Sequence, residues 1–158
     1  MPNSEPKLPA HELILYDGVC GLCNRFIKIV LDNDRLGHFQ FASLQGDIAT
    51  RLLGRLGKDP AVLKSIYLIQ GYPEAESLDT TPIEHLRLVS KARAALAICA
   101  QLEGPIHLVK YFSILPTWLL DFGYDLVAAN RYRIFGRHDT CPLPDPAHFA
   151  RFIDQSGA

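Results

Sequence analysis

The chain has 158 residues, of which 48% are hydrophobic and 21% are charged, and its formal net charge is −1. This composition supports a single hydrophobic core and excludes a disordered chain, while the near-zero charge gives no electrostatic basis for binding nucleic acid. No apolar run is long enough to span a bilayer, so we expect no stable membrane insertion.

Residues 1–11 are polar and rich in proline, and they lack the apolar stretch of a signal peptide. We therefore expect a flexible leader and a cytoplasmic location. The cytoplasm is reducing, so the four cysteines are not expected to form a disulfide framework. A closely spaced cysteine pair in that setting is more typical of catalysis.

Strand and helix signals alternate through the first half of the chain. A strand covered on both faces is apolar at consecutive positions, a half-covered strand alternates apolar and polar residues, and a helix repeats every three to four residues. By these patterns we expect strands at 12–16, 38–42 and 65–70, a helix from the cysteine pair to 32–34, and a helix capped by Asp47 that ends near Leu56.

One stretch of the second half is ambiguous. Thr81-Pro82-Ile83-Glu84 is a capping box with proline at the first helical position, whereas residues 85–89 alternate like a strand. We expect the strand, which leaves a long loop from Gly71 to Glu84. Helices are then expected at 91–102, 105–115 and 117–135, with a short terminal helix from Asp145 to Phe152.

An apolar face runs along the predicted helix at 117–135. It consists of Trp118, Leu119, Phe122 and Leu126. We interpret this face as core packing rather than as a membrane-surface helix, because the polar side of the helix is not strongly basic.

The order of the elements predicts the fold class. A βαβα segment followed by ββα and further helices indicates an α/β domain with a mixed β-sheet flanked by helices, which is the thioredoxin-like pattern. We expect this domain, including its C-terminal helices, to span residues 12–143. Residues 144–158 are expected to form a short helix and a tail.

A Cys-x-x-Cys pair lies where the first strand ends and the first helix begins. Free N–H groups and the dipole at a helix N-terminus stabilise a thiolate, which is the form that attacks disulfides. The spacing predicts Cys20 as the exposed attacking sulfur and Cys23, one turn further in, as the shielded sulfur that resolves the mixed disulfide. The redox group is then the Cys20–Cys23 disulfide itself, with no other cofactor and no metal.

Two other interpretations of the pair remain open. Zinc commonly needs four protein ligands, and no second compact pair is present, although Cys141 with His138 would complete a Cys₃His set. The pair is alternatively a structural one, made of two small buried residues. The turn residues Asp17-Gly18 and Gly21 disfavour that interpretation, because they hold the pair outside a core stripe.

Two separated motifs resemble those of a known family. Asp17, Cys20 and Cys23 match the Asp-x-x-Cys-x-x-Cys motif of the thioredoxin-like DCC thiol–disulfide oxidoreductases. Residues 124–136, which contain Asn-Arg-Tyr-Arg-Ile-Phe-Gly and are followed by Cys141, are similar to the carboxy-terminal block of that family. Ser90-Lys91-Ala92 is similar to its Ser-x-Ala junction, so the resemblance covers roughly residues 12–143.

The resemblance implies disulfide exchange. The partners it implies are a disulfide-containing protein or a low-molecular-weight thiol as substrate, and an external thiol system as reductant. Thioredoxins proper carry a proline between their cysteines and a cis-proline before a later strand. Here Gly21-Leu22 separates the cysteines and no proline immediately precedes Ser65. The peptide-docking mode that thioredoxins build around that proline is therefore not carried over.

Several residues around the pair are candidates for supporting roles. Asp17 either exchanges a proton with Cys23 or closes the turn and caps the helix, and both roles are open. The residues that frame the motif and form the candidate substrate-binding or supporting set are Tyr16, Gly18, Gly21 and Leu22.

The late motif contributes further candidates. We favour Arg131 and Arg133 as cations that complement the C-terminal dipole of their helix, the alternative being that one of them folds back over the cysteines to hold the thiolate or an anionic substrate. Cys141 is either a third redox thiol or a buried small residue. Cys99, in an apolar helical segment, is expected in the core.

Overall fold

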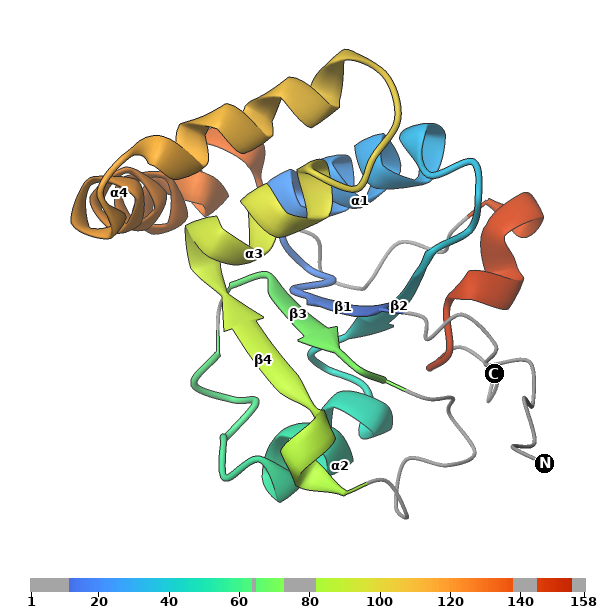
Figure 1. Cartoon of the computed structure of the whole chain (residues 1–158). Helices are drawn as coiled ribbons and strands as arrows, with labels where there is room; N and C mark the ends of the chain where they lie inside the picture. The colour runs from blue at the N-terminus through green and yellow to red at the C-terminus, as the bar shows by residue number, and fades with distance from the viewer. Residues whose placement is uncertain (1–11, 64, 73–81, 138–144, 155–158) are drawn as a thin grey trace, which may run out of the picture.

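Among the residues that the structure describes, four strands form one sheet. The structure is a computed structural model that describes residues 12–63, 65–72, 82–137 and 145–154. The strands are β1 (Glu12–Tyr16), β2 (Phe39–Ser43), β3 (Tyr67–Gln70) and β4 (Arg87–Ser90), in the order β2-β1-β3-β4 (Figure 1). β1 and β2 are parallel, whereas β3 is antiparallel to both β1 and β4. The sheet is therefore mixed.

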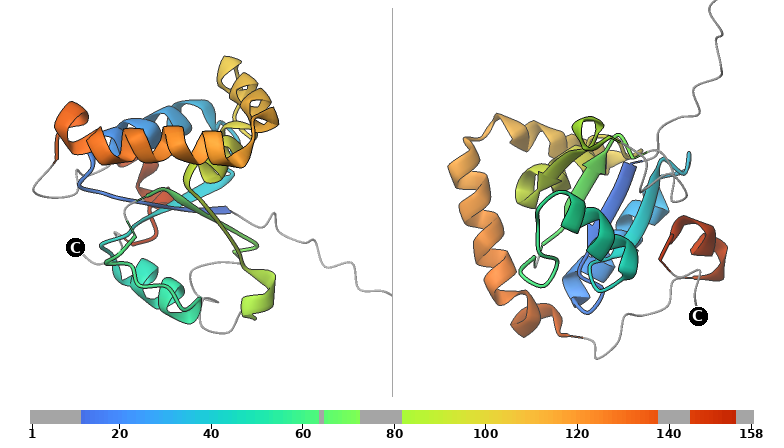
Figure 2. Two further views of the ribbon diagram at one scale, coloured as in Figure 1. Left: turned by 90° about the vertical axis from the view of Figure 1, so that its left-hand side faces the viewer. Right: turned by 90° about the horizontal axis from the view of Figure 1, so that it is seen from below.

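Helices cover both faces of this sheet. α1 (Gly21–Asn33) and α3 (Lys91–Cys99) lie on one face, and α2 (Asp47–Arg55) lies on the other (Figures 1 and 2). The 3-10 helix η3 (Pro105–Ile114) leads into α4 (Thr117–Phe135), which runs along the flank of the layer formed by α1 and α3. This is a thioredoxin-like α/β arrangement with additional C-terminal helices, and it confirms the predicted fold class.

The two faces of the sheet divide the core into two clusters. Leu13 and Leu15 of β1 pack toward α2, whereas Ile14 and Tyr16 pack toward α1 and α3. β1 lies between two other strands and is covered on both sides, which is why its apolar residues are consecutive.

The ambiguous stretch before β4 forms both a short helix and a strand, as its two sequence patterns indicated. The short 3-10 helix η2 (Ile83–His85) follows Pro82, and β4 begins two residues after it. The strand therefore starts later than expected.

The predicted cap of α2 is wrong: Gly46 is the N-cap and Asp47 is the first helical residue.

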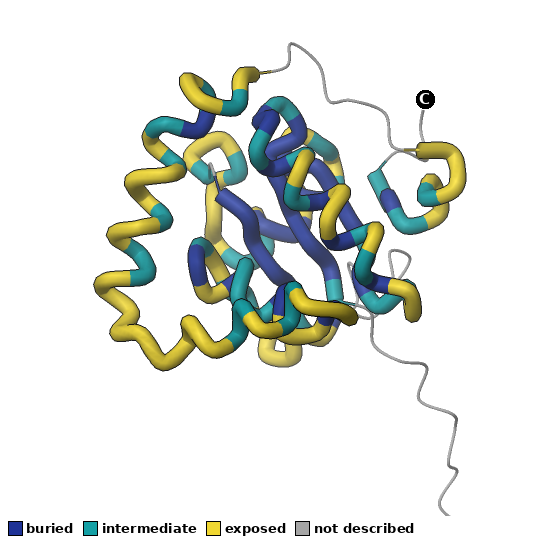
Figure 3. Tube along the Cα trace, turned by 90° about the horizontal axis from the view of Figure 1, so that it is seen from above, coloured by how far each residue is buried: buried dark blue, intermediate teal, exposed yellow. Residues whose placement is uncertain are grey.

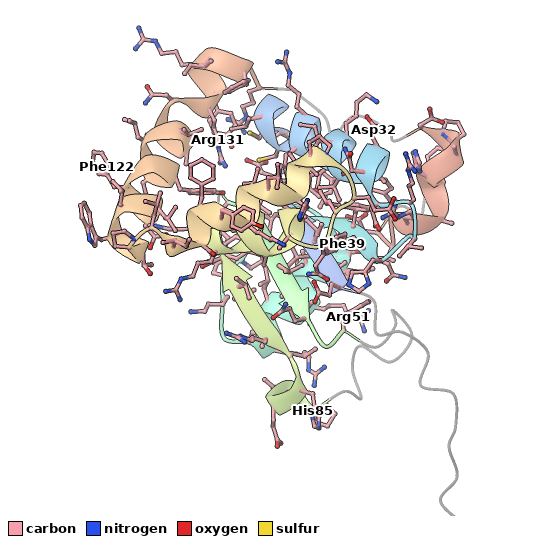
Figure 4. All side chains as sticks on the ribbon, turned by 45° about the horizontal axis from the view of Figure 1, so that its top comes forward. Asp32, Phe39, Arg51, His85, Phe122 and Arg131 are labelled. Carbon is pink, nitrogen blue, oxygen red and sulfur yellow. The ribbon has the colours of Figure 1, made fainter. Side chains whose placement is uncertain are left out.

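The expected core position of the apolar face on α4 is wrong. Trp118 and Phe122 are 71% and 64% exposed, and Leu119 and Leu126 are exposed as well. α4 contacts α1 and α3 along one side only, and that inner side carries Tyr124, Ala128 and Arg131 instead. Figure 3 shows α4 mostly in the colour of exposed residues, and Figure 4 shows Phe122 pointing away from the sheet. Periodicity grouped the residues correctly, but it did not tell which side of the helix is covered.

The last 3-10 helix, η4 (Pro146–Arg151), packs against the outer edge strand β2 (Figure 1). Phe152 is buried and stacks on Phe41, with a ring-centroid distance of 5.1 Å. Arg151 forms an ion pair with Asp34 and donates through Nε to the carbonyl of Phe39 at 3.1 Å. These contacts attach Arg151 and Phe152 to the core. Within the described residues, no helix has the length and apolar character needed to cross a membrane.

Candidate active site

The cysteine pair occupies the first turn of α1. Cys20 is the N-cap, with an extended backbone, and Cys23 lies one turn further in. The backbone N–H of Cys23 donates to Cys20 Sγ over 3.5 Å, and the N–H of Cys20 donates to the carbonyl of Asp17 over 3.1 Å. The turn after β1 and the start of the helix thus hold the two side chains beside each other.

This arrangement separates the pKa values of the two thiols. The hydrogen bond from the Cys23 side chain is the main cause that lowers the pKa of Cys20 to about 6, against the opposing effect of burial. Backbone N–H groups and the charge of Arg131 lower it further. The pKa of Cys23 is raised, because its thiol donates that hydrogen bond, is buried and faces the negative charge on Cys20. At neutral pH the pair therefore carries one thiolate, on Cys20.

The expected exposure of Cys20 is wrong, because both sulfur-bearing side chains are buried. Cys20 is 0% exposed and Cys23 is 3% exposed. The segment that ends α4 covers the motif: the N–H of Gly21 donates to the carbonyl of Gly136 over 3.3 Å, and Arg137 pairs with Cys20 as an antiparallel β-bridge. The two cysteines differ in their acidity, not in their exposure.

Gly21 permits this close approach of α4. A Cβ atom at position 21 would lie 2.2 Å from the backbone carbonyl oxygen of Phe135. Only glycine fits at this point without moving the backbone. The first of the two residues between the cysteines is therefore fixed by packing against the end of α4.

Arg131 crosses from α4 to the cysteine motif. Its side chain is buried, and Nη2 lies 3.1 Å from Asp17 Oδ2. Figure 4 shows Arg131 between α4 and α1. Our favoured interpretation of this residue as a surface cation at a helix end is wrong, and the alternative, in which it folds back over the motif, holds for Arg131. Arg133 is exposed on the same helix.

Asp17 is buried, and both of its carboxylate oxygens accept hydrogen bonds. Oδ2 accepts from Arg131 and from the hydroxyl of Tyr132, and Oδ1 accepts from Gln45 Nε2 at 3.0 Å and from the N–H of Val19 at 3.3 Å. A carboxylate with four donors is a fixed part of the structure, and it holds the guanidinium of Arg131 in place.

The remaining candidates form the frame of the motif. Tyr16 is a core residue, with its ring set edge-on to Phe152. The backbone of Gly18 donates to Gln45 Oε1 and accepts from Asn24 Nδ2, so the turn is tied at both ends. Leu22 is half-buried and lines a small cavity. Cys99 is buried in α3, as expected, and Cys141 lies outside the described residues.

Three contributors to the site were not identified from the sequence: Tyr132, Gln45 and Tyr124. Tyr132 lies inside the late motif, and its neighbour Arg131 was the available signal. Gln45 follows β2 without any pattern that marks it. The hydroxyl of Tyr124 accepts the N–H of Ile66, just before β3, at 3.2 Å.

Two hollows flank the motif. A groove of about 590 Å³ is lined by Asp17, Val19, Tyr132 and Arg137 together with residues around α2. A smaller cavity of about 140 Å³ lies between α1, α3 and α4 and has Cys23 in its wall. The smaller cavity has Cys23 in its wall, whereas Cys20 lines neither hollow.

No group of three or more potential metal ligands lies together within the described ranges. The zinc interpretation would need Cys141 and His138, which both lie outside those ranges.

Comparison with known proteins adds independent information. A family model described as DCC1-like thiol-disulfide oxidoreductase matches residues 14–137. A chloroplastic DCC family protein of Arabidopsis thaliana is 35% identical over 140 residues, which cover 88% of this chain and 72% of that protein. The uncharacterized protein YuxK of Bacillus subtilis (strain 168) is 30% identical over 143 residues, which cover 90% of this chain and 94% of that protein. No solved structure gives a significant match.

Proposed function

The chain belongs to the DCC1-like thiol-disulfide oxidoreductase family, and on that premise we propose that it reduces disulfide bonds, with Cys20 attacking and Cys23 resolving. The observation that carries this proposal is the position of the pair in the first turn of α1, where Cys20 is the N-cap and the N–H of Cys23 donates to Cys20 Sγ at 3.5 Å. The pKa of Cys20 is lowered to about 6, so its thiolate is present at neutral pH. The pKa of Cys23 is raised, so that thiol stays protonated until the resolving step.

The reaction takes two exchanges. The Cys20 thiolate attacks one sulfur of the substrate disulfide, a Cys20–substrate disulfide forms, and the other substrate sulfur leaves as a thiolate. Cys23 then gives up its proton and attacks Cys20 Sγ, so the second substrate thiolate leaves and a Cys20–Cys23 disulfide remains. The substrate gains two electrons, and its thiolates take one proton from Cys23 and one from solvent. The cysteine pair is itself the redox group, and an external thiol reductant returns it to the dithiol.

Arg131 and Asp17 support this chemistry by charge and position. The Arg131 guanidinium is buried close to both sulfurs and contributes to the lowered pKa of Cys20. Asp17 keeps that guanidinium in place and has its own oxygens occupied by donors, which favours a positioning role over proton transfer. The substrate is a protein disulfide or a low-molecular-weight disulfide, and the reaction suits a reducing compartment such as the cytoplasm.

A glutathione-coupled assay with bis(2-hydroxyethyl) disulfide, together with insulin reduction, tests this function. The wild-type protein should catalyse reduction, Cys20→Ser should reduce the rate to the uncatalysed level, and Cys23→Ser should accumulate a mixed disulfide detectable by mass spectrometry. Cys99→Ser is the matched control and should keep the wild-type rate. Lack of turnover by the wild type, or full activity of Cys20→Ser, would contradict the proposal.

A further inference from the structure

The cavity of about 140 Å³ beside Cys23 is lined almost entirely by apolar groups. Its wall consists of Leu22, Phe26, Ile66, Ala95, Tyr124, Val127 and Ala128, with Cys23 and Arg131 as the remaining members. Val127 in this wall is 47% exposed, and the cavity is partly open to solvent. The resolving thiol of the proposed reaction thus faces an apolar hollow that a ligand can enter.

The size and lining of this cavity define what fits. A dry apolar cavity of about 150 Å³ accepts one benzene ring in a well-studied engineered protein, and polar groups that enter such a space lose their hydration. Side chains from three helices, together with Ile66 just before β3, form the wall here, and none of them offers a carboxylate. An aromatic or branched aliphatic group is therefore accommodated by the apolar part of this wall.

Cys23 and Arg131 bring a thiol and a positive charge to the wall of the cavity. Arg131 is the charged group in the wall, and Cys23 is the thiol that attacks the mixed disulfide on Cys20. Cys20 is not in this wall, but its Sγ accepts from the N–H of Cys23 at 3.5 Å, so a substituent on the Cys20-bound substrate sulfur reaches the cavity alongside Cys23. The thiolate released when Cys23 attacks then forms beside a guanidinium, which stabilises its negative charge.

We propose that this cavity is the substrate subsite of the oxidoreductase, and that it selects disulfides in which one sulfur carries an apolar aromatic or branched aliphatic group. This inference rests on the proposed function. Cys20 attacks the sulfur that bears the apolar group and the more polar thiol leaves first. Cys23 then attacks Cys20 Sγ, and the apolar thiolate leaves, so that the substrate is reduced by two electrons and the protein holds the Cys20–Cys23 disulfide.

An asymmetric disulfide tests this selection directly. Benzyl 2-hydroxyethyl disulfide presents one apolar and one polar sulfur to the Cys23→Ser variant, which cannot resolve the adduct. Mass spectrometry then distinguishes a benzylthio from a hydroxyethylthio group on Cys20. Since filling an apolar pocket discriminates by about tenfold or more, we expect the benzylthio adduct in about tenfold excess.

Matched variants in the Cys23→Ser background assign this preference to the cavity. Ala128→Leu fills the cavity from α4 and should bring the two adducts to similar amounts. Ala129→Leu, at the exposed neighbouring position, should keep the benzylthio excess. If Ala128→Leu fails to fold, Ala95→Leu fills the same space from α3.

The outcomes separate this inference from the proposed function. Equal adducts in the Cys23→Ser protein, or a benzylthio excess that survives filling of the cavity, would overturn the subsite while the oxidoreductase function stands. If no adduct forms on Cys20 with this disulfide or with bis(2-hydroxyethyl) disulfide, both are wrong.

Discussion

The guanidinium of Arg131 lies 3.1 Å from the carboxylate of Asp17, although the two residues are 114 positions apart in the chain. Both side chains are buried, so the pair connects the last turns of α4 to the turn that carries the cysteines. This connection places a positive charge beside the sulfurs and fixes the segment that covers them. The late motif and the cysteine motif thus form one site.

Replacement of Arg131 by methionine should affect both stability and thiol acidity. The change leaves the buried carboxylate of Asp17 without its cation, which costs about 3–5 kcal/mol of unfolding free energy for a buried pair. It also removes a charge that lowers the pKa of Cys20, so that pKa should rise. Urea unfolding and the ultraviolet absorbance of the thiolate measure the two effects.

The exposed Arg133 provides the control on the same helix. Arg133→Met should change neither the unfolding free energy nor the pKa of Cys20. An Arg131→Met protein that retains wild-type stability would show that the ion pair is not formed in solution.

Asp17→Asn distinguishes positioning from proton transfer. The pKa of Cys23 is raised mainly by its hydrogen bond to Cys20 and by burial, and the charge of Asp17 adds to it. Removal of that charge should therefore lower the pKa of Cys23 and leave the resolving step as fast as in the wild type, or faster. If Asp17 instead accepts the proton of Cys23, the resolving step slows and the mixed disulfide accumulates. Stopped-flow measurement of mixed-disulfide decay decides between these two results.

The pH dependence of the reduced protein follows from the lowered pKa of Cys20. Between the pKa of about 6 in the folded protein and the ordinary value of 9.0, the unfolded chain binds a proton at Cys20 that the folded chain does not. Stability should therefore increase with pH across this range, by up to about 1.4 kcal/mol per pH unit, and the contribution is lost as the pH falls through about 6. Cys23, whose pKa is raised, adds no slope below its ordinary value of 9.0.

Two measurements test this titration. Unfolding free energies at several pH values should show the slope in the wild type and not in Cys20→Ser. Alkylation with iodoacetamide should label Cys20 with a midpoint near pH 6. Both thiols are buried, but the pKa of Cys99 is raised, so Cys99 should react far more slowly. Equal rates at these two cysteines would contradict the assignment of the thiolate.

Local sequence signals predicted most of the elements. The consecutive apolar residues of β1 indicated a strand buried on both faces, and Gly136 marked the end of α4 correctly. The cysteine pair was placed at the start of a helix because strand and helix patterns met there. Each of these features depends on residues within a few positions of one another.

The features that could not be predicted depend on contacts between distant segments. The apolar pattern of α4 identified residues that share a face, but the position of α4 along the flank of α1 and α3 decides which face is covered. Similarly, the burial of Cys20 results from the approach of Gly136 and Arg137. The partners of Arg131 could not be predicted from the sequence for the same reason.

Gly21→Ala should disrupt the packing of α4 on the motif. The added Cβ would meet the carbonyl oxygen of Phe135, a backbone atom that cannot rotate away, and overpacking of this kind costs about 1–3 kcal/mol. Because the same approach covers Cys20, alkylation of Cys20 should become faster as stability falls. Gly54→Ala in α2, where a Cβ meets nothing within 4 Å, should instead stabilise the protein by about 0.5–1 kcal/mol. Urea unfolding measures the change in unfolding free energy for both variants. Equal changes would rule out the close approach of α4 to Gly21.

Phe152→Ala tests whether the end of the described chain is part of the core. Phe152 is 4% exposed, stacks on Phe41 and contacts the ring of Tyr16, so its truncation should cost about 3–5 kcal/mol of unfolding free energy. Phe149, in η4, is 44% exposed, and Phe149→Ala should cost less than about 1 kcal/mol. Thermal or urea unfolding of the two variants gives the comparison. A small and similar cost for both would mean that η4 does not pack on β2 in solution, whereas a large cost for Phe152 alone makes this segment a structural part of the domain that carries the cysteines.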